Sequence, residues 1–268
     1  MFLKTPAKLN LHLEILRKRD DGFHDLNTVF RLIDIYDDLE FECINNSIRL
    51  KENSEQIINN IVVEAALLLK KRTSSQKGVI ISLKKNIPIQ KGLGGGSSDA
   101  AATLIALNHL WDINLSKKEL LKLGLELGSD VPFFIHGQTA WSEGRGEIFS
   151  NIDLKPEWYL LFFPKTKIST MEAFNQLNIS SKGHITKRRF LAGNSKNTFE
   201  EWAKNKYPEI KEIFLSTKSI GNPKLSGTGS TVFLTFANKQ EAKKALFEFP
   251  EAILVKSLEH SPYNHLIE

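Results

Sequence analysis

The sequence predicts an α+β fold built as two domains, residues 1–154 and 155–268. Segments with strand patterns and segments with helix patterns follow one another without regular strand–helix–strand alternation, which favours α+β over a doubly wound sheet. The succession of patterns starts again after "NIDLKPE", near residue 154. The 268 residues, 41% hydrophobic and 25% charged, suffice for two modest domains of a soluble protein.

Strand patterns open the chain. Residues 8–16 alternate leucine and isoleucine with polar neighbours, which predicts a half-buried strand. Residues 24–44 continue in strand style, with a turn expected at the acidic residues 36–38, and residues 78–89 predict a strand that Pro88 ends. Shorter strands are expected after a loop within residues 129–150, and in residues 158–164, 224–236 and 252–258.

Helix patterns lie between these strands. Residues 54–72 have apolar positions at helical spacing behind a capping Ser54, and residues 97–111 combine a serine cap with good helix formers. Residues 114–128 contain the capping-box pair Ser116 and Glu119. Further helices are expected around residues 169–177, 197–217 and 238–249.

Composition excludes several classes of protein. The net charge is +5, and no block of lysine and arginine with interleaved aromatics points to nucleic acid. No apolar run approaches the roughly 20 residues that span a membrane, and no signal peptide is visible, so we expect a cytoplasmic protein. The single Cys43 excludes an internal disulfide, and His260 and His265 lack metal-site spacing, so we expect no metal held by the chain itself.

Residues 88–102, "PIQKGLGGGSSDAAA", have the pattern of an anion cradle. Glycines let backbone N–H groups converge on one point, and the next helix adds its positive dipole end. A phosphate fits such a site, and a glycine-rich structural turn is the alternative. The dinucleotide pattern counted from Gly92 ends on Ser97, and no Gly-Lys-Ser/Thr, H-R-D or D-F-G signature occurs.

Three polar residues lie in apolar surroundings. The strand period points Lys8 and Asn10 to one face, where a lysine is costly unless it meets an acid or a ligand. Asp130 stands between small residues and an apolar segment. Taken singly, Lys8 reads as a strand-end lysine and Asp130 as a helix cap. Together, an ammonium beside a carboxylate is able to take or steer the proton of a substrate hydroxyl.

Two more stretches are candidate binding segments. Phe23 and His24 follow a turn glycine, and an aromatic beside a histidine suits a planar base, while a core phenylalanine and a surface histidine fit equally well. Residues 225–236, "LSGTGSTVFLTF", form either a plain hairpin or a turn whose hydroxyls support a phosphate site.

Over nearly its whole length the sequence resembles the GHMP kinases, the superfamily of galacto-, homoserine, mevalonate and phosphomevalonate kinases. The three motif regions stand in family order as "PAKLNLHLEI", "PIQKGLGGGSSDAAA" and "LSGTGSTVFL". The stretches "GFHDL", "GSDVPFF" and "EGRGE" narrow the resemblance to a member that phosphorylates a hydroxyl of a small molecule carrying a cytidine diphosphate.

The resemblance implies a two-domain GHMP-kinase-like architecture with the active site in the cleft between the domains. It implies ATP as donor, Mg²⁺ bound through the nucleotide phosphates, Asp130 as catalytic base and Lys8 as the cation that orients it. Implied ATP contacts are Pro88, Ile89, Gln90, Lys91, Gly92, Leu93, Gly94, Gly95, Gly96, Ser97 and Ser98. Implied substrate contacts are Asn10, Phe23, His24 and, facing Phe23, Phe174; supporting positions are Ser226, Gly227, Thr228 and Gly229.

Two stretches depart from the family pattern. Thr198 stands where many relatives have aspartate before a C-terminal helix, and a threonine still caps helices. Residues 180–196 are unusually basic, and we expect a mobile loop that attracts a diphosphate. Two other functions stay open, a GHMP kinase for another small alcohol or phosphomonoester and a nucleotide-binding protein without catalysis. We expect a monomer or weak homodimer, with no nucleic-acid or membrane partner.

Overall fold

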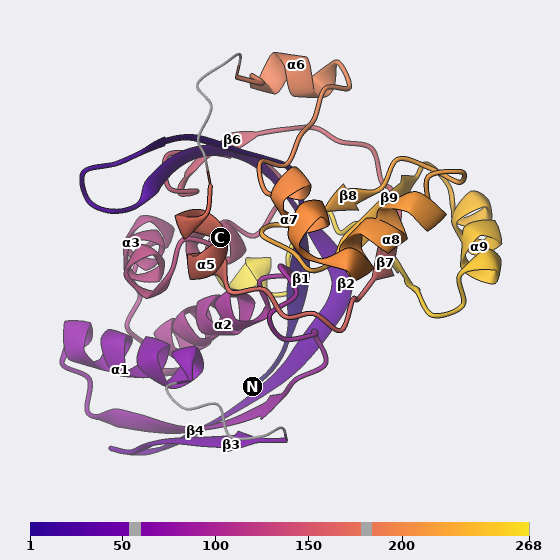
Figure 1. Ribbon diagram of the computed structural model, residues 1–268. Helices are drawn as coiled ribbons and strands as arrows, with labels where there is room; N and C mark the ends of the chain where they lie inside the picture. The colour runs from indigo at the N-terminus through magenta and orange to yellow at the C-terminus, as the bar shows by residue number, and fades with distance from the viewer. Residues whose placement is uncertain (54–59, 178–183, 268) are drawn as a thin grey trace.

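Two β-sheets, each covered by helices, make up the computed structural model, which describes residues 1–53, 60–177 and 184–267 (Figure 1). This arrangement confirms the α+β prediction. The predicted cap Ser54 and part of the basic segment, residues 180–183, lie outside the described residues. Within the described ranges, no helix combines the length and apolar character needed to cross a membrane.

The first sheet is organised around β2. One edge of β2 pairs with β1, and the other edge pairs with β4 along its C-terminal half and with β5 nearer its start. β3 runs parallel to β4, and β6 extends the sheet from β5. The strands are β1 (Phe2–Lys18), β2 (His24–Asn45), β3 (Ile48–Glu52), β4 (Lys77–Lys84), β5 (Ala140–Glu143) and β6 (Ile148–Asn151).

Helices cover one face of this sheet (Figure 1). The second sheet is antiparallel, in the order β10-β7-β9-β8, and carries its own helices. The helices of the first half are α1 (Ile61–Thr73), α2 (Gly95–Leu110), α3 (Lys117–Leu127) and α4 (Val131–His136). The second half contains β7 (Trp158–Phe162), α5 (Thr170–Asn175), α6 (Lys187–Leu191), α7 (Glu200–Lys206), α8 (Pro208–Ser216), β8 (Lys224–Leu225), β9 (Val232–Phe236), α9 (Lys239–Glu248), β10 (Ile253–Lys256) and a 3₁₀ turn (Asn264–Leu266).

β1 is buried on both faces, so the half-buried prediction is wrong. Every side chain from Thr5 to Ile15 is buried. One reason is that residues 196–198 lie along its end, where the backbone N–H of Leu13 donates to the carbonyl of Lys196 at 2.9 Å. Leu13 and Ile15 therefore belong to the core of the second half. In return, the C-terminal Tyr263 belongs to the core of the first half.

The predicted turn at residues 36–38 is also wrong, because β2 runs straight through it. A register shift pairs Pro6 with Tyr36 and Ala7 with Ile33, and this irregularity takes up the extra residues within the strand. The Asp37 side chain is fully buried there. β4 in turn ends at Lys84, before Pro88, because the next backbone N–H groups turn towards Asp37.

Several predicted helix starts are shifted. α1 is capped by Asn60, whose side chain accepts from Val62 N–H. α2 begins at Gly95 behind a left-handed Gly94, so the predicted serine cap is wrong. The capping box at the start of α3 is present as predicted. Residues 131–136, predicted as loop, form α4, since its proline occupies the first turn, where no backbone donor is needed.

The predicted domain boundary at residue 154 falls in the connection between β6 and β7. It remains a prediction. A third group of buried apolar residues lies where the two halves meet and draws on both sheets, with Leu9 and Leu11 from β1 and Tyr159 and Phe233 from β7 and β9.

Candidate active site

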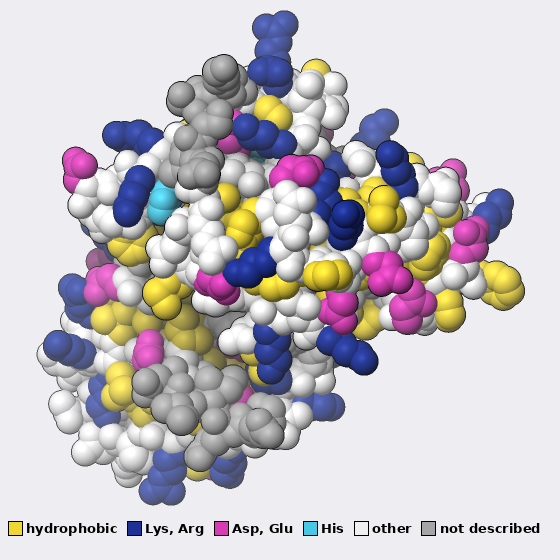
Figure 2. All heavy atoms as spheres, viewed as in Figure 1, with side chains coloured by type: hydrophobic (Ala, Val, Ile, Leu, Met, Phe, Trp, Pro, Cys, Tyr) yellow, Lys and Arg dark blue, Asp and Glu magenta, His cyan; other side chains and the backbone are white. Residues whose placement is uncertain are grey.

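Lys8 and Asp130 of the first half meet beside the loop of the second half that contains Gly227. The face of the molecule drawn in Figure 2 is hollowed between its upper and lower parts. The Lys8 ammonium is 3.3 Å from the Asp130 carboxylate and 2.5 Å from the side-chain oxygen of Asn10. Lys8 is 3% exposed, whereas the Asp130 side chain is 34% exposed. A nearly buried cation thus faces a carboxylate that an incoming molecule is able to reach.

The positions of Lys8, Asn10 and Asp130 follow from the elements that carry them. Lys8 and Asn10 share a face of β1, and the Asn10 amide donates to Thr28 Oγ1 of β2 at 2.8 Å. Asp130 precedes α4 and makes no capping hydrogen bond, which leaves its carboxylate directed at Lys8. Gly124 allows α4 to pack tightly on α3, because a Cβ there would lie 2.7 Å from Ile135.

The glycine loop passes directly over Lys8. The backbone N–H of Lys8 donates to Leu93 O at 2.9 Å. Gly94 has a φ of +71°, and a Cβ on it would lie 2.9 Å from the Phe134 ring and 3.1 Å from Lys8 Cε. Only glycine meets both requirements. The first turn of α2 follows immediately and leaves backbone N–H groups without intrahelical partners.

The second glycine-containing loop, residues 225–230, closes over the first. A Cβ on Gly92 would lie 2.3 Å from Ser226 O, and the Ser226 hydroxyl donates to Gly92 O at 3.0 Å. Gly227 is less crowded but has a φ of +58°, and a Cβ on it would lie 3.3 Å from Asn10 Oδ1 and 3.5 Å from the Lys8 ammonium. The Asn197 amide donates to the carbonyls of Leu225 and Gly227, both at 2.8 Å, and fixes this loop.

The remaining predicted positions lie in the two loops and in the first turns of α2. Ser97 and Ser98 lie in the first turns of α2, with Ser98 buried. Thr228 lies 3.4 Å from Thr170 of α5, hydroxyl to hydroxyl. The Lys91 ammonium donates to the carbonyls of Pro164 and Thr166 and to Ser230 Oγ, so it fastens the glycine loop to the second half. Pro88 and Gly95 are half-buried, Ile89, Gln90 and Gly96 are exposed, and Gly229 is buried.

A second corner of the site contains the predicted base contacts. His24 lies against Phe174 of α5, with ring centroids 5.0 Å apart, and Phe174 in turn contacts Phe199. Burial lowers the pKa of His24, with Lys18 adding to the effect. Phe23 is 44% exposed, and the group lying on its ring is the guanidinium of Arg145 rather than Phe174.

Comparison with known protein families matches both halves of the chain. Residues 60–138 match the GHMP kinases N terminal domain, and residues 177–253 match the GHMP kinases C terminal domain. The chain belongs to the GHMP kinases. It is 40% identical over 253 residues to 4-diphosphocytidyl-2-C-methyl-D-erythritol kinase of Pseudomonas aeruginosa, covering 93% of this chain and 90% of that protein. It is 39% identical to the kinase of the same name from Acinetobacter baumannii, at 97% and 96% coverage.

Solved structures agree with this family. A crystal structure of 4-(cytidine 5'-diphospho)-2C-methyl-D-erythritol kinase superposes with a TM-score of 0.82 at 30% identity, covering 96% of this chain and 99% of that one. A mevalonate kinase superposes with a TM-score of 0.72 at 17% identity, covering 97% and 99%, and shows the shared fold. The two-domain GHMP kinase architecture expected from the sequence is therefore confirmed.

This GHMP kinase has a buried charge cluster beneath the glycine loop that sequence reasoning missed. The Lys85 ammonium contacts the carboxylates of both Asp37 and Asp99, the latter at 2.7 Å. Asp37 also accepts from the backbone N–H groups of Asn86 at 2.5 Å and Ile87 at 2.8 Å, the residues that lead into the loop. Burial raises the pKa of Asp99, and the neighbouring Lys85 opposes that rise.

The described part of the basic segment makes several contacts with β1, while its expected mobility and its attraction for a diphosphate remain predictions. Glu14 of β1 is 1% exposed and lies 2.5 Å from the Lys196 ammonium and 3.1 Å from His184 Nδ1. It also accepts from Ile185 N–H at 2.8 Å. Burial opposes ionisation of Glu14, but these hydrogen bonds together hold its pKa below its usual range. Thr198, expected as a helix cap, instead accepts from Ile15 N–H of β1.

The buried His12 should make the stability of this GHMP kinase depend on pH. Burial lowers the pKa of His12 to about 4, against an ordinary value of 6.5. Its Nδ1 accepts from Lys196 N–H, so the neutral ring carries its proton on Nε2. Between pH 6.5 and pH 4, His12 is protonated in the unfolded chain but stays neutral in the folded chain. We expect the free energy of unfolding to fall by about 3 kcal/mol for this group as the pH drops from 6.5 to 4.

Urea unfolding at several pH values checks this expectation. His12→Phe keeps a ring stacked on Trp141 but removes the titration, so its stability should fall less steeply with pH. The pKa of His136 is also lowered to about 4 by burial, and this group contributes equally to both proteins. Equal slopes for the wild type and the variant would contradict the prediction.

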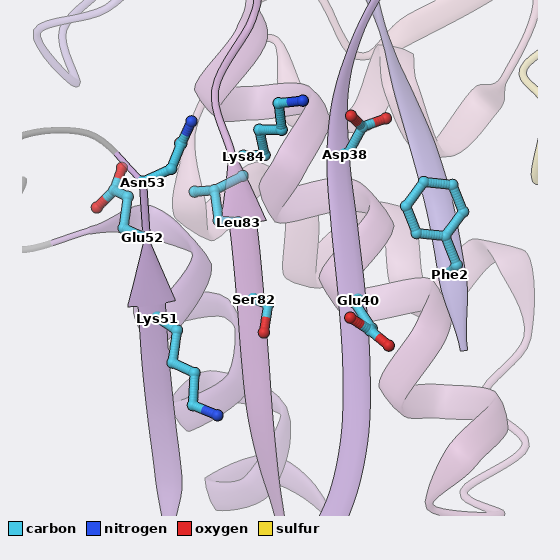
Figure 3. Close-up of a pocket in the computed structure, with 9 residues that line it drawn as sticks. All are labelled: Phe2, Asp38, Glu40, Lys51, Glu52, Asn53, Ser82, Leu83 and Lys84. Carbon is cyan, nitrogen blue, oxygen red and sulfur yellow. The ribbon is translucent and has the colours of Figure 1, made fainter.

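A hollow of about 430 Å³ lies elsewhere, on the face of the first sheet turned away from the helices (Figure 3). Strands β1 to β4 contribute its lining, which mixes acidic and basic side chains. The lining residues are Phe2, Asp38, Glu40, Lys51, Glu52, Asn53, Ser82, Leu83 and Lys84. None of them is a predicted site residue, so we assign this hollow no part in the chemistry.

Proposed function

We propose that this chain transfers the γ-phosphoryl group of ATP to a hydroxyl of 4-diphosphocytidyl-2-C-methyl-D-erythritol, giving the 2-phosphate. The reaction would serve the non-mevalonate route to isoprenoid precursors in the cytoplasm. The observation that carries the proposal is the Lys8–Asp130 pair, 3.3 Å apart beside the glycine loop. The names of relatives about 40% identical to this chain support the choice of substrate.

The donor side is assigned to the glycine loop and the start of α2. Left-handed Gly92 and Gly94 let the loop pack directly against the second loop and against Phe134 and Lys8, where a Cβ would collide. The N–H groups and the positive dipole end of α2 favour phosphate oxygens at that point. We assign the loop from Pro88 to Ser98 to the ATP phosphates, with residues 226–229 in support.

We assign Mg²⁺ to the nucleotide phosphates rather than to a set of protein ligands. Magnesium keeps waters and substrate phosphates as ligands and needs few protein carboxylates. Within residues 1–53, 60–177 and 184–267, no group of three or more His, Cys, Asp and Glu side chains could cage a metal ion. When bound to ATP, the ion would neutralise charge on the transferring phosphoryl group.

Asp130 and Lys8 are assigned the chemical step. Asp130 accepts the proton of the substrate hydroxyl while that oxygen forms its bond to the γ-phosphorus, and the bond from the γ-phosphorus to the leaving ADP oxygen breaks. Lys8 orients the Asp130 carboxylate and stabilises negative charge beside the acceptor oxygen. Asn10 holds Lys8 in place through the 2.5 Å hydrogen bond.

The acceptor side is assigned to Phe23, His24 and Phe174. Phe23 offers an exposed aromatic face. His24, the next residue, packs its ring against Phe174 of the second half. Such an arrangement suits a cytosine ring, which needs aromatic faces for stacking and a neighbouring hydrogen-bonding group.

A coupled kinase assay with ATP and 4-diphosphocytidyl-2-C-methyl-D-erythritol tests the proposal. We expect turnover with this substrate and none with mevalonate, homoserine or galactose. Turnover with one of those alcohols alone would favour the GHMP kinase of different specificity. ATP binding without turnover of any substrate would favour the catalytically silent protein.

Phe23→Ala should weaken the cytidine substrate specifically. Base–aromatic stacking contributes roughly 1–3 kcal/mol, so we expect the KM for this substrate to rise about 5- to 150-fold while the KM for ATP stays constant. Phe247→Ala is the matched control, because Phe247 is 90% exposed on α9. An unchanged substrate KM in Phe23→Ala would remove Phe23 from the site.

A further inference from the structure

The turn between β5 and β6 has two glycines with positive φ, and the proposed reaction assigns it no role. It contains the "EGRGE" stretch, with Arg145 between Gly144 and Gly146, whose φ values are +73° and +115°. A Cβ on Gly146 would lie 3.4 Å from the carbonyl oxygen of Ser129, the residue before Asp130. The turn therefore lies against the segment that carries the catalytic carboxylate.

The same turn reaches the base corner. The backbone N–H of Leu26 in β2 donates to Gly144 O at 2.8 Å, which ties the turn to the strand that follows Phe23. The Arg145 guanidinium carbon lies 3.4 Å from the centre of the Phe23 ring, in direct contact with one face. A planar guanidinium stacks on an aromatic face in a way that a lysine ammonium does not.

The contact leaves a buried polar atom of Arg145 without a hydrogen bond to any residue that the structure describes. Its Nε is buried and has no hydrogen-bond partner among the described residues. No carboxylate in the described part of the chain lies within 4.0 Å of its guanidinium as an ion-pair partner. Glu147, the nearest acid in sequence, accepts instead from the Arg145 backbone N–H at 2.6 Å. Burial opposes ionisation of Asp21, but the Phe23 backbone N–H, Arg19 and the charge of Arg145 together hold its pKa below its usual range. The Arg145 guanidinium thus lies on the Phe23 ring, with Asp21 as a more distant opposite charge.

We propose that Arg145 is a positioning residue for the substrate base. It clamps one face of Phe23, so that the half-exposed ring presents its opposite face to the planar ring of the cytidine head. The inference rests on the proposed function, because it requires a base stacked on Phe23. Arg145 itself touches neither the base nor the phosphates.

Binding of CDP by calorimetry, alongside steady-state kinetics, tests this role. In Arg145→Ala we expect the Kd of CDP and the KM of the cytidine substrate to rise about three- to tenfold, with kcat and the KM of ATP within twofold of wild type. Arg145→Lys should retain part of the affinity, since a cation still lies near the ring. Arg72→Ala, at an exposed arginine paired with Glu126, is the control and should change nothing.

The double variant Phe23→Ala/Arg145→Ala separates positioning from direct contact. If Arg145 acts through Phe23, its removal adds no further loss in the Phe23→Ala background. A further loss of the same size there would mean that Arg145 binds the substrate itself, and would overturn the proposal. So would an unchanged Kd in Arg145→Ala, or a fall in kcat without a change in KM.

The outcomes for the two proposals are distinct. A wild-type protein that phosphorylates the cytidine substrate while Arg145→Ala matches it supports the function and rejects the clamp. A wild-type protein that binds CDP in an Arg145-dependent way without phosphorylating this substrate supports the clamp and rejects the function. A wild-type protein that neither binds CDP nor phosphorylates the cytidine substrate rejects both.

Discussion

Asp130→Asn is expected to lower kcat by about 10²–10⁴-fold, the range that a positioned general base contributes, while ATP binds as in wild type. Asparagine keeps the size of the side chain but no longer accepts the hydroxyl proton. The Lys8 ammonium retains Asn10 as a partner, so the variant should fold normally. Single-turnover kinetics with nucleotide binding by calorimetry measures both quantities.

Asp112→Asn is the matched control for this prediction. Asp112 lies on the surface after α2, where its carboxylate pairs with Lys77 and is 80% exposed. The control should match wild-type kcat. A near-normal kcat in Asp130→Asn would reject Asp130 as the base, and loss of ATP binding together with kcat would point to a collapsed loop instead.

Lys85→Met should destabilise the protein by about 3–5 kcal/mol, the cost of leaving buried charge unpaired. The Lys85 side chain is 8% exposed, and its ammonium is shared by the carboxylates of Asp37 and Asp99, which are 0% and 1% exposed. Methionine fills similar space but offers them no charge. Urea unfolding at pH 7 gives the change in the free energy of unfolding.

Two further variants make this test specific. Lys77→Met removes an ammonium from the exposed pair with Asp112, and the free energy of unfolding should hardly change. Adding Asp99→Asn to Lys85→Met removes one of the two buried charges, so the double variant should be more stable than Lys85→Met alone. Equal losses in Lys85→Met and Lys77→Met would contradict the role of burial.

Sequence reasoning succeeded where the decisive contacts are local or the motif is distinctive. The capping box of α3 needs only residues three apart, and it is present as predicted. The pairing of Lys8 with Asp130 could be anticipated because a lysine on an apolar strand face requires an acidic partner. The family motifs then supplied the architecture, which the comparisons confirm.

Sequence-based prediction was wrong where the local structure depends on residues far away in the sequence. The acidic residues 36–38 have the composition of a turn, but Lys85 and two backbone donors satisfy Asp37 inside a strand. α4 was missed because a proline usually marks a break, whereas in the first turn of a helix it is tolerated. The contact of Arg145 with Phe23 joins residues from two hairpin turns, and no short-range pattern encodes it.

The exchange of segments between the two cores has a consequence for how the protein unfolds. Leu13 and Ile15 of β1 pack in the core of the second half, and Tyr263 packs in the core of the first. Neither core is complete without residues from the other half. We therefore expect both halves to unfold together in one cooperative transition rather than one after the other.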